Sequence, residues 1–504
     1  NINAEYYDAE AQIKGGKITA EKDAILLKTG ANHKATIAVS GGTFSSAVLP
    51  EYCADGFIPT KNDDGTYGVK SGSYVAEVNG EKYEDLEDAV RAANEGDTVK
   101  LLSDTTVDYG IGVYKKLTVD LNGKTVTGTG SYVFYVGWDG GDLTVKNGVI
   151  KPEQGSAVKA EGNLSLINTD IVGTSTSGHL LVIADDAKVT VDKDSTLDAD
   201  NINNKSDAVF FEENRYYEHN PELHVYGNIH GNGSFIISGN GTDKGISKIY
   251  IYDGAEITGE GLAMYLPQLC EVNITGGTVK GYCAIGIKSG TLNISGGLVQ
   301  GFANVNDIDD EDSRGDGMTY DGSAILIDSR SDGYAGQVNI NISGSAKVES
   351  LYSTAIREIG NDPAKTSIEN INITGGQVLG GSGMDAVKVR DISIPAVSIS
   401  GGTFSSEVPA DYCADGYKAV KNSDGTYGVI GLTISRNMSL ENSLTMTYNV
   451  TPGEYKVVKG VYSFYDATLN NNAGGYADTT VLPVLKNGVY ALSFNGINPQ
   501  RLMD

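Results

Sequence analysis

The chain has 504 residues, of which 65 are glycine, 11 are proline and 40% are hydrophobic, so we expect several folded units rather than one compact core. The formal net charge of −27 argues against a nucleic-acid partner and against anionic membrane surfaces. No apolar run is long enough to span a bilayer and no signal peptide is present, so no membrane insertion is expected.

One stretch of 31 residues occurs twice, as VSGGTFSSAVLPEYCADGFIPTKNDDGTYGV at 39–69 and as ISGGTFSSEVPADYCADGYKAVKNSDGTYGV at 399–429. The copies lie 360 residues apart and agree at 21 positions. Such self-similarity predicts a repeat architecture in which each copy closes a stack of coils. Cys53 and Cys413 hold equivalent places in the copies, and we expect both to be small buried residues without a disulfide.

Three regions follow from this repeat. Residues 1–71 are predicted to be the last coils and the cap of a preceding β-helix unit, and residues 72–431 the main parallel β-helix. Residues 432–504 have alternating strands without Gly-Gly turns, which predicts a small antiparallel β domain that stops short. The first residues do not resemble a natural start, so we expect a monomeric fragment of a longer chain.

One short helix is predicted where the main region begins. Leu86, Ala89, Val90 and Ala93 recur at helical spacing, and Gly96 follows them. An open solenoid end exposes unpaired strand edges, which favour aggregation. We therefore expect this helix to cap the main stack.

Short strands and glycine turns fill the remainder of the main region. One strand pattern begins with a small residue, as at Ala263 and Ala284, and a second ends in Ile-Ser-Gly-Gly or Ile-Thr-Gly-Gly. The second pattern predicts that Ile274, Ile294 and Ile373 stack along one axis. The predicted fold class is all-β, a right-handed parallel β-helix, or solenoid.

These segments resemble modules of bacterial surface proteins. The resemblance is carried by GGTFSS…DYCADGYKAVKNSDGTYGV, by YVAEVNGEKYEDLEDAVRAANEGDTVKLLSDTTV and by LTVDLNGKTVTG. They are similar to large surface proteins of gut Firmicutes, which are Gram-positive, with pectate-lyase-like right-handed β-helices. The tail, with SLTMTYNV, is similar to a β domain that often follows them. The resemblance implies an extracellular, cell-wall or cell-surface location and supplies no catalytic residues; the cap cysteines depart from the valine expected there.

Pectinases of the β-helix class supply the main catalytic alternative. A polygalacturonase needs Asn-Thr-Asp, Asp-Asp, Gly-His-Gly and Arg-Ile-Lys on successive coils, so that its carboxylates converge on one glycosidic oxygen. The chain has Asn168-Thr169-Asp170 and Asp185-Asp186 less than one coil apart, and lacks the other two motifs. Asp185-Asp186 are predicted to form a turn.

An acidic insertion, NVNDIDDEDSRGDGMTYDG at 304–322, is the candidate Ca²⁺ site. The ligands would be Asp310, Asp312, Asp316 and Asp321, whose spacing partly matches an EF-hand loop. Arg314 occupies a ligand position and breaks that match. A solvated acidic loop is the alternative, and no other cofactor is expected.

The outward positions of the first strand pattern form the candidate ligand-binding row. They are Tyr135, Lys159, Phe210, Tyr265, Gly286, Leu326, Arg357 and Lys388. Exposed aromatic rings offer flat apolar faces on which sugars can stack, unless loops cover this face. Trp138, Tyr216 and Tyr217 are further candidate contacts, and His224 is expected to face outward between Leu223 and Val225.

The sequence thus predicts a non-catalytic, adhesin-like surface protein that presents a binding face to a glycan or a host protein. Two alternatives stay open: a polysaccharide lyase or glycoside hydrolase, and a stalk that binds nothing.

Overall fold

A computed structural model describes residues 2–4, 8–29, 32–174, 176–202, 207–212, 217–240, 244–304, 321–329, 336–360, 366–431 and seven strands between 434 and 494. Only the backbone is described at 2–4, at 328–329 and after 431. The chain divides into two units, Asn1–Asn204 and Lys205–Asp504. The boundaries expected at residues 71 and 431 stay predictions.

The first unit begins with parallel strands. Strand β1 pairs with β3, and β2 pairs with β4, which places Ile13 opposite Val39. Phe44 and Val48 pack with Val39 in a small core, and β5 and β6 form an antiparallel hairpin. The bounds are β1 Ile2–Ala4, β2 Ala9–Ile18, β3 Leu27–Thr29, β4 Ala35–Phe44, β5 Phe57–Lys61 and β6 Tyr67–Ser71.

The two copies of the repeated stretch have the same local structure. Each has a short 3-10 helix, Pro50–Tyr52 or Ala410–Tyr412, followed by a hairpin, which in the second copy is β42 (Tyr417–Lys421) and β43 (Tyr427–Gly431). The hairpin turns also match. Asn62 Nδ2 donates to Thr66 Oγ1 at 2.9 Å, and the corresponding bond in the second copy, from Asn422 to Thr426, is also 2.9 Å.

The predicted helix is confirmed as α1 (Leu86–Ala92). The Asp85 carboxylate accepts the backbone N–H of Glu87 at 2.7 Å and so caps the first turn. Leu86, Ala89 and Val90 form the buried face, which contacts β7, β8, β9 and β11. These strands are β7 Ala76–Val78, β8 Glu81–Tyr83, β9 Thr98–Leu101 and β11 Ile111–Val113.

The coils of the first unit follow the helix. Strands β11, β14, β16 and β18 pair in parallel on one side, and β12, β15, β17 and β19 pair in parallel on another. Strands β15 and β17 are long enough to run through two coil sides. The bounds are β10 Thr105–Val107, β12 Lys116–Asp120, β13 Thr125–Gly128, β14 Tyr132–Val136, β15 Asp142–Pro152, β16 Ser156–Ala160, β17 Asn163–Val172, β18 Leu181–Ala184, β19 Lys188–Val191 and β20 Thr196–Ala199.

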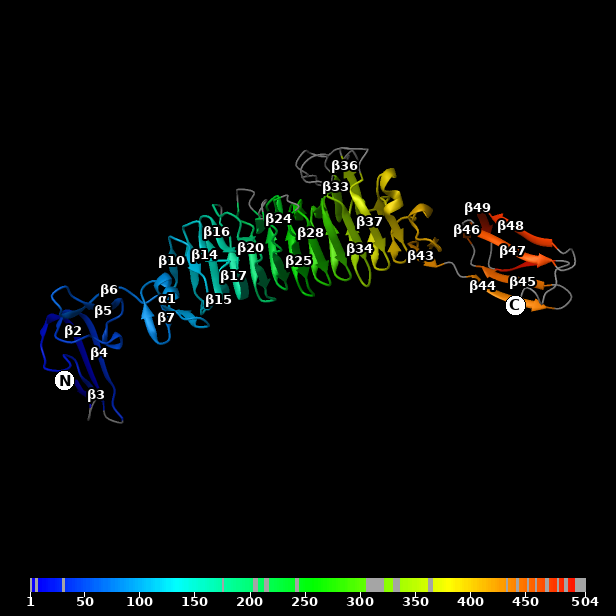
Figure 1. The fold of residues 1–504 in the computed structure, drawn as a ribbon. Coiled ribbons are helices and arrows are strands. Elements are labelled where there is room, and N and C mark those ends of the chain that lie inside the picture. Colours follow the sequence, from blue (N-terminus) through cyan, green and yellow to red (C-terminus); the bar gives the residue numbers. More distant parts are fainter. Residues whose placement is uncertain are drawn as a thin grey trace. The chain divides into compact units, whose positions relative to one another are not determined.

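Coils of three strands build the second unit. Strand β25 pairs in parallel with β28, and β28 with β31, so each strand meets its equivalent one coil away, as Figure 1 shows. The bounds are β21 Val209–Glu212, β22 Glu222–Val225, β23 Asn228–Gly231, β24 Phe235–Gly239, β25 Ser247–Ile251, β26 Glu256–Gly259, β27 Leu262–Leu266, β28 Cys270–Ile274, β29 Thr278–Gly281, β30 Cys283–Ile287, β31 Gly290–Ile294, β32 Leu298–Gly301, β33 Ile325–Ser329, β34 Val338–Ile342, β35 Lys347–Ser350, β36 Ile356–Gly360, β37 Ile368–Ile373, β38 Gln377–Leu379, β39 Val387–Lys388, β40 Val397–Ile399 and β41 Thr403–Phe404.

Branched apolar side chains fill the interior of these coils. Ile274, Ile294, Ile342 and Ile373 are paired in register along the stack, and all four are buried. Side chains between them point outward, as period-2 alternation requires. The predicted fold class, a parallel β-helix, is confirmed.

The last strands of the second unit are antiparallel, as predicted. Strand β45 pairs with β44 and β50, β46 with β49, and β47 with β48. The bounds are β44 Ile434–Leu440, β45 Leu444–Val450, β46 Gly453–Val457, β47 Gly460–Asp466, β48 Asn471–Ala477, β49 Thr480–Val484 and β50 Gly488–Phe494.

The four cysteines are all free, and Cys270 and Cys283 are buried. The expectation that Cys53 and Cys413 are buried is wrong, because both are only half-buried beside the 3-10 helices of the caps. Within the described residues, no helix has the length and hydrophobicity that a membrane crossing needs.

Candidate functional site

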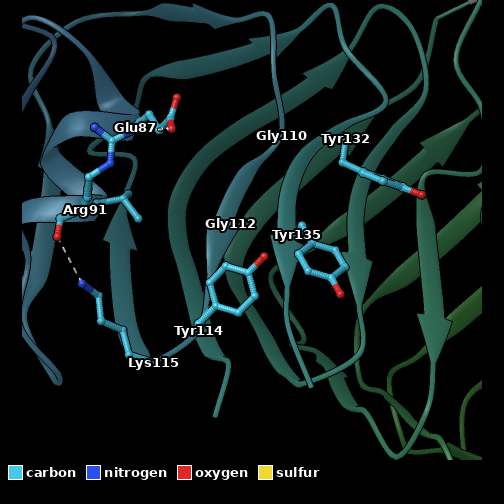
Figure 2. A pocket seen from close by; sticks show the side chains of 9 residues that line it. Glu87, Arg91, Gly110, Gly112, Tyr114, Lys115, Tyr132 and Tyr135 are labelled. Atoms are coloured by element: carbon cyan, nitrogen blue, oxygen red, sulfur yellow. Dashed lines mark hydrogen bonds and ion pairs between the residues drawn. The ribbon is translucent and has the colours of Figure 1, made fainter. Parts of the chain in front are cut away.

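The first unit carries a surface groove with a volume of about 620 Å³ beside α1. Residues from α1, from β11 and the loops before and after it, and from β14 line it (Figure 2). The lining residues are Glu87, Val90, Arg91, Gly110, Gly112, Tyr114, Lys115, Tyr132 and Tyr135. The groove therefore joins one side of the capping helix to the outward face of the first coils.

Tyr114 is the most exposed ring in the groove, at 60%. Two glycines make room for it, because a Cβ atom on Gly112 would lie 2.8 Å from its ring and one on Gly137 would lie 2.5 Å away. The ring thus packs against bare backbone and still faces solvent. This arrangement holds an apolar surface in place without burying it.

Three tyrosine rings lie one after another along the groove, in the spatial order Tyr114, Tyr135 and Tyr132. The ring centroids of Tyr114 and Tyr135 are 5.9 Å apart, with planes at 62°, and those of Tyr135 and Tyr132 are 6.5 Å apart. Figure 2 shows the Tyr114 and Tyr135 rings beside each other, with Tyr132 beyond them. Such a row of rings suits a ligand with flat apolar faces.

The charged groups of the groove already have partners. Arg91 pairs with Glu87 at 2.6 Å and with Asp88 at 2.9 Å. Lys115 Nζ donates to the carbonyl oxygens of Arg91 and Ala93 at the end of α1, where the helix dipole favours a cation. Among the described residues that line the groove, Glu87 is the only carboxylate. The groove therefore offers no uncompensated charge to an ionic ligand.

The inner wall is fixed by a hydrogen-bonded tyrosine. Tyr135 OH donates to Glu161 Oε2, and Lys159 Nζ lies 3.4 Å from Glu161 Oε1. Burial and this acceptor raise the pKa of Tyr135 well above its ordinary value, so the phenol stays protonated. The ring is thereby held in one orientation against β16.

Of the residues expected in this part of the chain, Tyr135 lines the groove and Trp138 is 71% exposed in the turn after β14. Tyr114 and Tyr132 were not among the residues predicted from the sequence. The available signal was the Gly110-Ile111-Gly112 run before Tyr114, because alternating glycines on a strand leave its outward face bare.

The candidate row of the second unit lies in register, although Ser238, which the predicted row did not include, falls between Phe210 and Tyr265. Phe210, Ser238, Tyr265, Gly286, Leu326, Arg357 and Lys388 are paired in succession on β21, β24, β27, β30, β33, β36 and β39. The expected exposure is wrong for Tyr265, which is 9% exposed, and for Leu326, at 1%. Both pack in an outer apolar cluster with Leu262, Cys283 and Ile359, whereas Lys388 is exposed.

The remaining candidate residues are scattered. Tyr217 is 67% exposed, and Tyr216 lies outside the described residues. Of the expected Ca²⁺ ligands, Asp310, Asp312 and Asp316 also lie outside them. Asp321 is buried, and its carboxylate accepts from Ser323 Oγ at 2.6 Å and from Arg357 Nη1 at 3.2 Å. The guanidinium already provides a counter-ion for this carboxylate.

The two pectinase-like motifs, Asn168-Thr169-Asp170 and Asp185-Asp186, have structural roles. Thr169 is buried and its hydroxyl donates to the carbonyl oxygen of Val145 at 3.1 Å, while Asp170 accepts the N–H of Thr196. Asp185 and Asp186 form the predicted turn, with Asp185 in the left-handed region at φ 52°.

Asp207 is a buried carboxyl next to the candidate row, where it accepts a hydrogen bond from Ser238 Oγ. Burial raises the pKa of Asp207 from 3.8 to about 7, although the serine bond partly opposes this. The folded state then binds more protons than the unfolded chain between these two pKa values. Stability should fall as the pH rises through this window and then level off.

We therefore expect Asp207→Asn to raise the melting temperature at about pH 8 and to change it little at about pH 4.5. Thermal unfolding at both pH values measures the difference. The exposed Asp253→Asn serves as the matched control. If Asp207→Asn changed the melting temperature equally at both pH values, the raised pKa of Asp207 would be contradicted.

No protein-family model, no curated protein and no solved structure matches this chain.

Proposed function

We propose that this chain is a non-catalytic extracellular β-helix protein that binds carbohydrate in the groove of Tyr114 and Tyr135. The observation that carries the proposal is the exposed Tyr114 ring supported by the backbone of Gly112 and Gly137. Large apolar side chains are seldom left exposed beside one another without a binding role. Aromatic rings in a shallow groove present flat faces to the apolar faces of sugar rings.

The ligand class is a neutral glycan. An acidic polysaccharide such as pectin would need free cations, yet Arg91 is paired with Glu87 and Asp88, and Lys115 is bonded to helix carbonyls. Breaking such pairs costs free energy that a neutral sugar does not require. The resemblance to surface proteins of gut Firmicutes adds a bacterial cell surface as the location and an adhesin-like role.

The test combines Tyr114→Ala with Tyr135→Ala. We expect affinity for neutral oligosaccharides to fall at least about tenfold, because central aromatic residues dominate such contacts. Glycan-array screening followed by calorimetry with the best neutral ligand and with oligogalacturonate measures it. Tyr83→Ala, on β8 and outside the groove lining, is the control.

Several outcomes would count against the proposal. Binding of oligogalacturonate in preference to neutral sugars would overturn the ligand class. Equal affinity of the double variant and the wild type would overturn the site. Release of new reducing ends from any glycan by the wild type would favour a hydrolase instead.

A further inference from the structure

The first unit contains three Asn-Gly pairs, which differ in how firmly the glycine amide is held. They are Asn79-Gly80, Asn122-Gly123 and Asn147-Gly148. The three asparagines have φ values of 53°, 51° and 61°, so all of them lie in the left-handed region. An Asn-Gly pair is chemically labile, because glycine has no side chain to hinder attack of its nitrogen on the asparagine side chain. The neighbouring atoms therefore decide which pair reacts.

Asn79 and Gly80 form the turn between β7 and β8. Val78 is paired with Glu81, and Gly80 has φ 82°, as a type I′ hairpin turn requires. Both turn residues are exposed, and a Cβ atom on Gly80 would meet nothing within 4 Å. Among the described residues, nothing accepts a hydrogen bond from the Gly80 N–H. This nitrogen is therefore open to solvent and to a base.

The other two pairs are held by neighbouring coils. The Gly123 N–H donates to the carbonyl oxygen of Asn147 at 2.6 Å, and Asn122 Nδ2 donates to that of Leu101 at 3.0 Å. A Cβ atom on Gly148 would lie 2.5 Å from a backbone carbonyl oxygen, so this glycine is tightly packed. Reaction at either pair needs a local opening that breaks these contacts.

The Asn79 side chain ties the β7–β8 hairpin to the chain that follows the capping helix. Asn79 Nδ2 donates to Asp97 Oδ2 at 2.7 Å, and the same oxygen accepts the N–H of Asn94, just after α1, at 2.7 Å. The Asn94 N–H first, and then the Asn79 amide, lower the pKa of Asp97, so its carboxylate is ionised at neutral pH. A carboxylate in place of the Asn79 amide would face Asp97 and repel it.

We propose that Asn79 is a site of spontaneous deamidation that loosens the β7–β8 hairpin as the protein ages. The Gly80 nitrogen attacks Asn79 Cγ and closes a succinimide ring, and the side-chain nitrogen leaves as ammonia together with the proton of the Gly80 amide. Water then opens the ring at either carbonyl, which gives aspartate or isoaspartate. The aspartate repels Asp97, and the isoaspartate inserts a methylene carbon into the main chain of the tight turn.

The experiment incubates the whole chain at mildly alkaline pH and follows each Asn-Gly pair by peptide mapping with mass spectrometry. In the folded chain, Asn79 should convert at least about tenfold faster than Asn122, because the Gly123 amide must first break its hydrogen bond. In urea, where only the local sequences differ, the two rates should become similar. Conversion of Asn122 as fast as Asn79 in the folded chain, or conversion of Asn79 in urea alone, would overturn the proposal.

Variants test the consequence of the reaction separately. Asn79→Asp, which imitates one product, should speed hydrogen exchange in β7, β8 and α1 about fivefold at neutral pH. Adding Asp97→Asn should reverse most of this change, because the pair again has one amide and one carboxylate. Asn79→Gly is the matched control, since it keeps a type I′ turn and adds no charge. Equal exchange in Asn79→Asp and Asn79→Gly would contradict the loosening of the hairpin.

Discussion

Glu358→Ala is expected to destabilise the coils at the end of the β-helix by about 3–5 kcal/mol. The Glu358 carboxylate is buried and accepts from Ser367 Oγ and Ser393 Oγ, each at 2.8 Å. It also accepts the backbone N–H of Arg390 at 2.9 Å and Arg390 Nη2 at 3.1 Å. Alanine would leave the half-buried Arg390 without this carboxylate and two serine hydroxyls without this acceptor.

Hydrogen exchange followed by mass spectrometry measures this effect coil by coil, which suits a solenoid because its coils can open locally. We expect faster exchange in β36, β37 and the 3-10 helix Asp391–Ala396. The matched control is Glu256→Ala, which removes an exposed carboxylate from the same unit. Similar exchange in both variants would show that the Glu358 network contributes no net stability.

Gly290→Ala is the second substitution with a large expected effect, also about 3–5 kcal/mol. Gly290 has φ 107°, and it opens β31 opposite Cys270. A Cβ atom there would collide with the backbone carbonyl oxygen of Cys270, which is fixed in the parallel pairing. The variant must therefore part β28 from β31 at this corner, and the melting temperature should fall accordingly.

A second glycine separates the two causes of this loss. Gly254 has φ 85°, but a Cβ atom there would meet nothing within 4 Å. Gly254→Ala should therefore show only the backbone strain of about 1–2 kcal/mol. If both variants melt at the same temperature, the collision with the Cys270 carbonyl would contribute nothing to the destabilisation of Gly290→Ala.

The fold could be predicted because its rules are local. Ile274, Ile294 and Ile373 each precede a glycine turn, and a strand with period-2 alternation buries every second side chain whatever the neighbouring coil contains. The helix was equally clear from Leu86, Ala89 and Val90. In each case a few adjacent residues decide the structure.

The candidate site could be predicted only in part, because it depends on contacts between distant residues. Tyr135 was recognised from its outward position, but the exposed Tyr114 ring needs Gly137 from the next coil beneath it. Tyr265 and Leu326 also occupy outward positions, yet both are buried in an outer layer that alternation alone does not reveal. Alternation places Asn273, Asn293 and Asn341 outward, but it does not reveal the hydrogen bonds between them, because these bonds join residues 20 and 48 positions apart.

The two caps hold themselves together with bonds inside their own hairpins, as between Asn62 and Thr66 and between Asn422 and Thr426. Because these bonds lie within one hairpin, the structure of that hairpin does not depend on how many coils precede it. Gene duplication or deletion of whole turns can therefore add coils to such a stack, or remove them, while the same closing hairpin is reused. Evolution can then change the length of the stack by one coil at a time without changing its fold.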